Sequence, residues 1–264
     1  MAITPPQGGE IRSGPVEGES ARMTMPDTRN RLLRALPPSE LEQLWPRFDR
    51  VEVRKREVLV RRGAPLVFAY FPEGGLSSNL ATTSDGRRIE VGCFGFEGMV
   101  SIAAALGSDR APHEIMVQVG GPWLRISVEN LQRAIQISPT LRVLLMRYAH
   151  IFTLTLSHTA LANGSYSVEE RLARWILMCH DRLQGDDLPL THEFLSLMLG
   201  VQRTTVTLAI QALEGQRMIR AKRGLITVLD REQLCRLAGD SYGVAEAEYE
   251  RLIGPFRDKA PQHE

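Results

Sequence analysis

The chain has 264 residues, of which 43% are hydrophobic and 24% charged, and its net charge at pH 7 is +1. This length allows two modest domains, each with its own core, and the near-neutral charge means that any basic surface must be local. No apolar run is long enough to span a bilayer and no signal peptide is present, so we expect a cytoplasmic protein that does not bind membranes. The three cysteines are odd in number and far apart, which argues against a disulfide framework.

The first part of the chain divides into a leader and a short helical segment. Residues 1–28 are rich in Pro, Gly, Ser and Glu, and we expect a disordered leader there. A helical segment is predicted after Asn30, where Ser39 followed by Glu42 has the spacing of a capping box.

Short β-prone segments dominate the next part of the chain. They are "VEVRK", "EVLVRR", "LVFAYF", "SSNLATT", "RRIEVGCF", "EIMVQVG" and "PWLRIS", and turn residues separate them. β-branched and aromatic residues in short runs at regular spacing are typical of an antiparallel sandwich or barrel. We therefore predict a jelly-roll domain over residues 29–138.

A long helix is predicted over residues 139–164, and its apolar residues lie on more than one face. A helix of this kind needs two partners, so one face is expected to cover the β domain and the other a second copy of the chain. A single buried helix in a monomer is the alternative. The two apolar stripes consist of Leu141, Leu145, Tyr148 and Phe152, and of Leu144, Ile151 and Leu154.

The region 165–240 is predicted to contain three helices and a hairpin, followed by an extension over residues 241–264. In the second helix, "LTHEFLSLMLG", Thr191 has the character of an N-cap and Gly200 of a helix stop. The third helix comes directly after, and "RAKRGLITVLD" has the pattern of a two-stranded wing. Helix, short turn with Gly, and helix is the order of a helix-turn-helix motif.

The second helix of such a motif enters the major groove, and its N-terminal residues face the bases. Arginine can bind guanine, glutamine can bind adenine, and threonine can contact a thymine methyl group or a phosphate. Residues 201–231 hold six basic and two acidic residues, a local excess of positive charge that favours contact with phosphates. We predict DNA contacts from Gln202, Arg203, Thr204, Thr205 and Thr207 on the helix, and from Arg220, Lys222 and Arg223 on the wing.

The segment "LPLTHEFLSLMLGVQRTTVTLAIQALEGQRMIRAKRGLITVLD" resembles the helix-turn-helix signature of the Crp/Fnr family of bacterial transcription regulators. The resemblance covers roughly residues 30–234. It implies an α+β fold with an N-terminal cyclic-nucleotide-binding-like jelly roll, a long dimerisation helix and a C-terminal winged helix-turn-helix. It also implies a homodimeric regulator, not an enzyme, whose partners are double-stranded DNA with a two-fold site and RNA polymerase. By position, Thr191 would contact phosphate and Arg203 would contact a base.

The chain departs from the family pattern in both domains. Thr204 replaces a common acidic residue and Leu208 replaces an arginine of some members, so the preferred DNA site is expected to differ. In the sensor, Phe96 occupies the position of a ribose-binding glutamate, and a phenylalanine cannot accept a hydroxyl hydrogen bond. We therefore expect no cyclic AMP binding of the usual kind. The candidate effector residues are Gly95, Glu97, Gly98, Arg110 and Ala111, with an unidentified small effector and no resident cofactor.

Two alternatives remain open at this stage. One is a cyclic-nucleotide-gated regulator in which Arg110 binds the phosphate. The other is a jelly-roll enzyme with an accessory helical domain, but the histidines and cysteines show no metal-binding spacing. The run Cys179-His180-Asp181 contains the ingredients of a catalytic triad. Adjacent positions on a helix point in different directions, however, so we expect Cys179 to be a core thiol.

Overall fold

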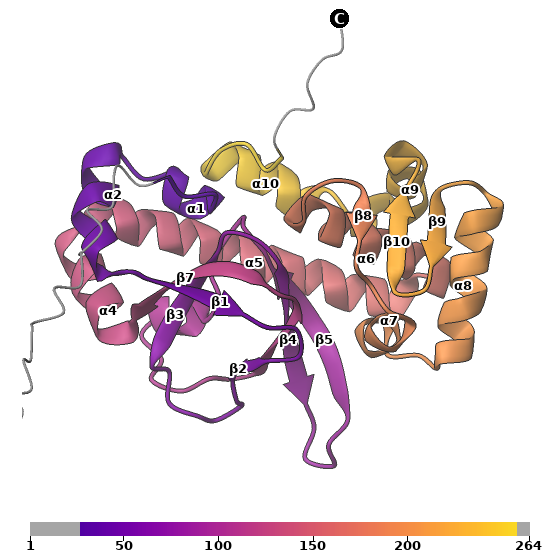
Figure 1. Cartoon of the computed structure of the whole chain (residues 1–264), viewed down its shortest axis with the longest axis horizontal. Coiled ribbons are helices and arrows are strands. Elements are labelled where there is room, and N and C mark those ends of the chain that lie inside the picture. The colour runs from indigo at the N-terminus through magenta and orange to yellow at the C-terminus, as the bar shows by residue number, and fades with distance from the viewer. Residues whose placement is uncertain (1–26, 258–264) are drawn as a thin grey trace, which may run out of the picture.

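Two antiparallel sheets form the N-terminal domain in the computed structural model, which describes residues 27–257. One sheet has the order β1-β7-β3 and the other the order β2-β6-β4-β5. All seven predicted strands are present, and the predicted jelly-roll sandwich is confirmed (Figure 1). The leader predicted for residues 1–28 lies outside the described residues, apart from its last two. The strands are β1 (Asp49–Val53), β2 (Val58–Val60), β3 (Phe68–Pro72), β4 (Leu76–Thr82), β5 (Arg88–Phe94), β6 (Glu114–Val119) and β7 (Gly121–Ser127).

The helical segment before the sandwich consists of α1 (Arg31–Arg34), α2 (Pro38–Leu44) and the 3-10 turn η1 (Trp45–Arg47). Asn30 caps α1, because its side chain accepts a hydrogen bond from the Leu33 amide. The capping box predicted at Ser39 is wrong, since Ser39 lies inside α2 and no side chain caps that helix. Pro38 has a fixed φ that suits the first helical position, so the helix begins before the serine.

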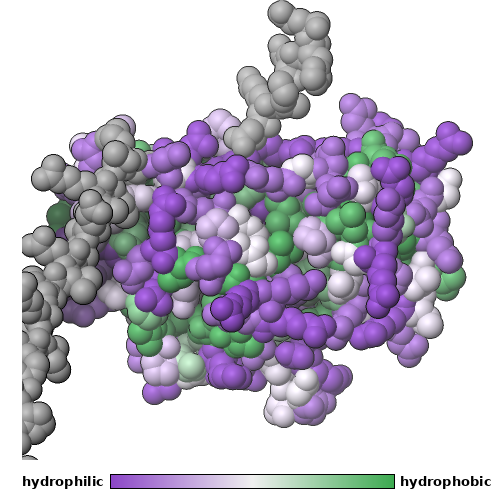
Figure 2. All heavy atoms as spheres, in the orientation of Figure 1, coloured by the Kyte–Doolittle hydropathy of each residue, from purple (hydrophilic) through white to green (hydrophobic). Residues whose placement is uncertain are grey.

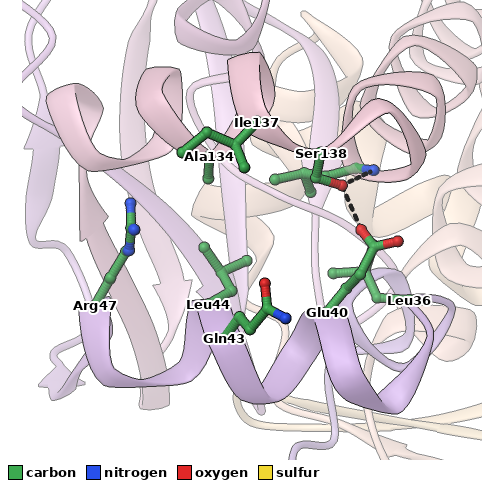
Figure 3. Close-up of a pocket in the computed structure, with 9 residues that line it drawn as sticks. Leu36, Glu40, Gln43, Leu44, Arg47, Ala134, Ile137 and Ser138 are labelled. Carbon is green, nitrogen blue, oxygen red and sulfur yellow. Dashed lines mark hydrogen bonds between the residues drawn. The ribbon is translucent and has the colours of Figure 1, made fainter.

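Helix α3 (Ile102–Ala105) lies between β5 and β6. Helices α4 (Val128–Ile137) and α5 (Pro139–Ser165) come after β7. Ser138 lies at the junction of α4 and α5 and caps α5 by accepting a hydrogen bond of 2.9 Å from the Leu141 amide. The same hydroxyl donates to Glu40 of α2, so α2 is fixed across the junction (Figure 3). The N-terminal helices and the start of the long helix therefore form one unit.

Both predicted apolar stripes of α5 are buried within a single chain, apart from the half-buried Leu154. One of the two stripes was expected to meet another copy of the chain, but Leu144 and Ile151 of the second stripe are also covered within the chain itself. Both belong to a cluster that also contains Tyr249 from the C-terminal extension, an element whose helix the sequence analysis did not predict. The exposed face of α5 is a third one, which carries Val143, Met146 and Leu161.

The C-terminal region packs as a helical domain with a small sheet of order β8-β10-β9. Its last helix returns to the jelly roll and runs beside α5 and α1 (Figure 1). The Tyr249 hydroxyl of this helix donates a hydrogen bond of 2.6 Å to the Glu97 carbonyl. The elements are α6 (Val168–Arg182), β8 (Asp187–Leu188), α7 (His192–Leu199), α8 (Arg203–Gly215), β9 (Ile219–Lys222), β10 (Leu225–Val228), α9 (Arg231–Ala238), η2 (Gly239–Ser241) and α10 (Val244–Leu252).

The core of the helical domain continues into the jelly roll. Leu76, Leu80 and Cys93 of the sheet belong to the same buried cluster as the apolar residues of α6, α7 and α8. Burial raises the pKa of the Cys93 thiol. Cys93 therefore behaves as a packed apolar side chain and not as a nucleophile. The position of α7 and α8 is therefore set by the jelly-roll sheet as well as by their own domain.

Candidate nucleic-acid interface

The turn between α7 and α8 has the local structure that the sequence predicts. Thr191 is the N-cap of α7, and its side chain accepts a hydrogen bond of 3.2 Å from the Phe194 amide. Gly200 ends the helix with φ of 62°, a left-handed conformation that costs glycine little. The edge-to-face contact of Phe194 with Trp175, at 5.8 Å between ring centroids, fixes α7 on α6.

Helix α8 has one buried and one exposed face. Val206, Ala209, Ile210 and Leu213 are buried and form one apolar stripe along the helix. At its start, Gln202, Arg203 and Thr204 are exposed, while Thr205 and Thr207 are half-buried. The Thr207 hydroxyl donates to the Arg203 carbonyl at 3.0 Å, so part of its hydrogen-bonding capacity is used within the helix.

The wing lies beside the start of α7. Strands β9 and β10 are antiparallel: Ile219 pairs with Val228 at one end and Lys222 with Leu225 at the other. Gly224 lies in the turn between them. A Cβ atom placed on Gly224 would lie 3.9 Å from the Thr191 methyl group, so the tip of the wing adjoins the helix-turn-helix. A strip of hydrophilic side chains lies in this region of the surface, with apolar patches beside it (Figure 2). The three predicted wing cations are all exposed: Arg220, Lys222 and Arg223.

One acidic residue beside Arg203 was missed by the sequence analysis. The Glu193 carboxylate lies 3.5 Å from the Arg203 guanidinium and 3.0 Å from that of Arg56, which belongs to the jelly roll. Thr204 left Arg203 without an acidic neighbour in the sequence, and the partner comes from α7 instead. Only the fold brings these residues together, although an acidic residue two positions after the N-cap Thr191 was visible in the sequence.

The run Cys179-His180-Asp181 is structural, as the geometry of a helix requires. Cys179 is fully buried in the shared core, and burial raises its pKa well above the ordinary value. The His180 Nε2 atom lies 2.8 Å from Asp186, and Asp181 lies 2.7 Å from the Arg231 guanidinium. The Arg231 guanidinium also lies 3.2 Å from His180 Nδ1, whereas Cys179 packs in the core, so the prediction that Cys179 is a core thiol is confirmed.

Three of the candidate effector residues, Gly95, Glu97 and Gly98, lie in close contact with α6 or α5. The Glu97 carboxylate is 2% exposed, contacts Arg182 of α6 at 2.8 Å and accepts a hydrogen bond from the Gly95 amide. A Cβ atom on Gly95 would lie 2.6 Å from Arg182, and one on Gly98 would lie 1.9 Å from the Tyr148 hydroxyl. The two glycines therefore permit close packing, and the Glu97 carboxylate is already occupied.

The hollow under the jelly roll lies elsewhere, between the sandwich and α5, and has a volume of about 220 Å³. Ala111 lines it, but Arg110 is exposed and donates a hydrogen bond of 2.9 Å to the Gly63 carbonyl. Burial and the charge of Arg62 lower the pKa of His113 at the same hollow. Its other lining residues are mostly apolar, and include Leu66, Phe94, Ile102, Ile115, Phe152 and Leu156.

Two further observations concern residues 27–257. No three histidine, cysteine or carboxylate side chains gather there in an arrangement that could hold a metal ion. None of the helices in this part of the chain is long and apolar enough to cross a membrane.

Comparison with known proteins supports both halves of the architecture. Residues 170–237 match the family described as the Crp-like helix-turn-helix domain. No curated protein sequence matches the chain.

Solved structures of regulators superpose on both domains. FixK2 from Bradyrhizobium japonicum gives a TM-score of 0.65 at 18% identity, over 73% of this chain and 98% of that one. The c-di-GMP responsive regulator CLP from Xanthomonas campestris gives 0.59 at 19% identity, over 73% and 99%. A CooA variant from Carboxydothermus hydrogenoformans gives 0.58 at 15% identity, over 82% and 99%. The chain therefore carries a Crp-like helix-turn-helix domain on the fold of the Crp/Fnr family regulators.

Proposed function

We propose that the chain is a homodimeric, sequence-specific DNA-binding regulator of transcription. The observation that carries the proposal is the exposed polar start of α8, whose opposite face is buried and whose neighbour is a basic wing. An arginine buried in the core would have been incompatible with DNA contact, and Arg203 is 65% exposed. Transcription activation would add RNA polymerase as a further partner.

The proposed roles of the DNA-contacting side chains follow from where each side chain lies. Gln202, Arg203 and Thr204 face outward at the end of α8 that would enter the major groove, and Thr205 follows them. Thr191 lines the same hollow as Gln202 and Arg203 and adjoins the wing turn at Gly224, so Thr191 and the exposed wing cations suit phosphate contacts, which provide affinity but no sequence choice. Glu193 lies against Arg203, so this carboxylate would have to share or release the guanidinium when DNA binds.

The exposed face of α5 is the surface that suits a second copy. Val143, Met146 and Leu161 lie on this face, and small exposed side chains such as Thr153 and Ser157 lie between them. Small and apolar residues at this spacing allow two helices to approach closely. Pairing along α5 would place the two recognition helices about one DNA turn, or about 34–36 Å, apart, as a two-fold site requires.

The test of DNA recognition is selection of binding sequences from a random pool of duplexes. We expect a palindromic motif, because two identical recognition helices would contact two half-sites. Recovery of no motif would contradict the proposal.

The test of the dimer uses Met146→Glu, which places a charge on the exposed face of α5. We expect this variant to sediment as a monomer and to lose binding to the palindrome. Ile137→Glu is the matched control, since Ile137 is also an exposed apolar residue but lies at the end of α4. Equal sedimentation of Met146→Glu and wild type would exclude α5 pairing by this face.

For the sensor domain we propose an effector that is small and uncharged, held in the hollow between the sandwich and α5. The lining is mainly apolar, the nearby Arg110 is turned outward, and Glu97 is occupied by Arg182. Calorimetry with cyclic AMP and cyclic GMP should therefore give flat titrations. Binding that disappears in Arg110→Ala would instead support the cyclic-nucleotide-gated alternative.

A further inference from the structure

A second hollow lies outside the jelly roll, between its β2-β6-β4-β5 sheet and the start of α7 and α8. This interdomain cleft has a volume of about 800 Å³, within the range of about 300–1,000 Å³ typical of small-molecule sites. Both domains contribute to its lining. Its basic residues are Lys55 and Arg56 from the β1–β2 turn, Arg87 and Arg88 from the β4–β5 hairpin, and Arg203 from α8.

Positive charge dominates the interdomain cleft. Among the described residues that line it, Glu193 is the single carboxylate, and it contacts both Arg56 and Arg203. One carboxylate is thus shared by two guanidiniums from different domains. Arg87 and Arg88 pair with Asp85 and Glu114 beside the cleft, so the excess of positive charge comes from Lys55, Arg56 and Arg203. Concave surfaces lined by one sign of charge concentrate counterions of the other sign.

The wall of the cleft also holds an unused hydrogen-bond donor. Gln118 of β6 is 7% exposed and lines the cleft, yet its Nε2 atom has no hydrogen-bond partner among the described residues. A buried donor without a partner costs free energy, and such groups are rare in folded proteins. A ligand with oxygen acceptors would satisfy this amide.

Helix α8 adds further donors at the same place. It begins at Arg203, and the N-cap residue Gln202 makes no side-chain hydrogen bond to the first turn. The first amides of the helix are therefore not capped by that side chain, and a helix N-terminus favours anions. Gln202 itself lines the cleft, as does Thr191 at the start of α7.

We infer that the interdomain cleft binds a small phosphorylated molecule. Arg56 and Arg203 hold its phosphate groups in place of the Glu193 carboxylate, and Gln118 donates a hydrogen bond to a phosphate oxygen. Arginine pairs with phosphate through two parallel hydrogen bonds, which suits two guanidiniums already placed around one anion. A DNA duplex presents its phosphates on a rigid convex surface, which does not suit a side chain as enclosed as Gln118.

A consequence for regulation rests on the proposed function. Because Gln202 and Arg203 are the proposed base-contacting residues, a ligand in the cleft and DNA compete for the same side chains. The ligand also bridges the two domains and so favours the arrangement of the domains in this structure.

The test is calorimetric titration of the full chain with inorganic pyrophosphate, in the absence of DNA. We expect saturable binding that weakens at least tenfold in Arg56→Ala and in Gln118→Leu. Arg133→Ala is the matched control, because Arg133 is an exposed, ion-paired arginine on α4 outside the cleft. Absence of binding, or equal affinity in wild type and in both cleft variants, would overturn the inference.

Glu193→Gln tests the same site in the opposite direction. Removal of the competing carboxylate should strengthen pyrophosphate binding several-fold, a gain that misfolding cannot produce. Unchanged or weaker binding in this variant would mean that the phosphates do not occupy the position of Glu193.

Competition with DNA separates this inference from the proposed function. Pyrophosphate should raise the apparent Kd for the selected palindrome, and Glu193→Gln should make the competition stronger. Protein that binds pyrophosphate but no DNA would refute the proposed function and leave the cleft assignment standing. Protein that binds DNA but no pyrophosphate, with a weaker salt dependence in Arg56→Ala, would assign the cleft to the DNA backbone and refute the inference.

Discussion

The two ends of the molecule use charged and polar residues in opposite ways. At the helix-turn-helix, Arg203 and the wing cations are exposed and free to meet a partner, apart from the surface contact with Glu193. In the jelly roll, the effector candidates Gly95, Glu97 and Gly98 are enclosed, and Glu97 pairs with Arg182 where both are at most 5% exposed. A sequence motif at the surface thus keeps its chemistry available, whereas the same residue types in an interior become part of the packing.

The largest expected effect comes from breaking the enclosed pair. Arg182→Leu leaves the Glu97 carboxylate buried without its cation, which typically costs about 3–5 kcal/mol. Urea denaturation followed by circular dichroism measures the loss.

The double variant Glu97→Leu/Arg182→Leu is the control for this prediction. It removes both charges, so it should recover most of the lost stability. A fully stable Arg182→Leu protein would show that Glu97 is not committed to the joint between the domains, and its role in effector binding would have to be considered again.

This contrast also explains which parts of the structure could be predicted from the sequence. The strands, the two motif helices and the exposed face of α8 follow from periodicity and from local signals such as Thr191 and Gly200. The burial and pairing of Glu97 depend on Arg182, which lies 85 residues away in the sequence, and on how the two domains pack together. No local pattern records such a contact, and for the same reason the docking of α10 on α5 could not be predicted.

The next prediction concerns DNA at the exposed end. Arg203→Ala should cost about 1–3 kcal/mol of binding free energy and relax the preference at one base position. Lys222→Ala should weaken binding to all sequences alike and reduce the slope of the salt dependence. Binding of both variants to the palindrome and to single-base substitutions of it measures the difference, and a uniform loss in Arg203→Ala would contradict its assigned role.

A pH effect of intermediate size is expected from Glu90 at the enclosed end. Burial raises the pKa of this carboxyl well above its ordinary value, and the nearby Ser78 and Arg182 oppose this only in part. Its contribution to stability is therefore complete below the ordinary pKa of about 4.3 and decreases as the pH rises toward the pKa in the folded state. The slope is at most about 1.4 kcal/mol per pH unit.

Glu90→Gln cannot ionise, so this variant should lose that part of the pH dependence. We expect its stability relative to wild type to increase from pH 4 to pH 8 in urea denaturation. Parallel pH profiles for the two proteins would mean that Glu90 ionises with its ordinary pKa in the folded state.

The smallest expected effect tests whether surface charges hold the domains together. Arg56 and Glu193 form an interdomain ion pair of 3.0 Å, but their side chains are 74% and 58% exposed. Solvent screens such a pair, so Arg56→Ala should change the free energy of unfolding by less than about 1 kcal/mol. A loss as large as that of Arg182→Leu would show that the cleft residues close the joint. A small loss would mean that the buried contacts of Glu97 and the shared core hold the two domains together. Any change in pyrophosphate binding by Arg56→Ala would then reflect the cleft itself and not the stability of the fold.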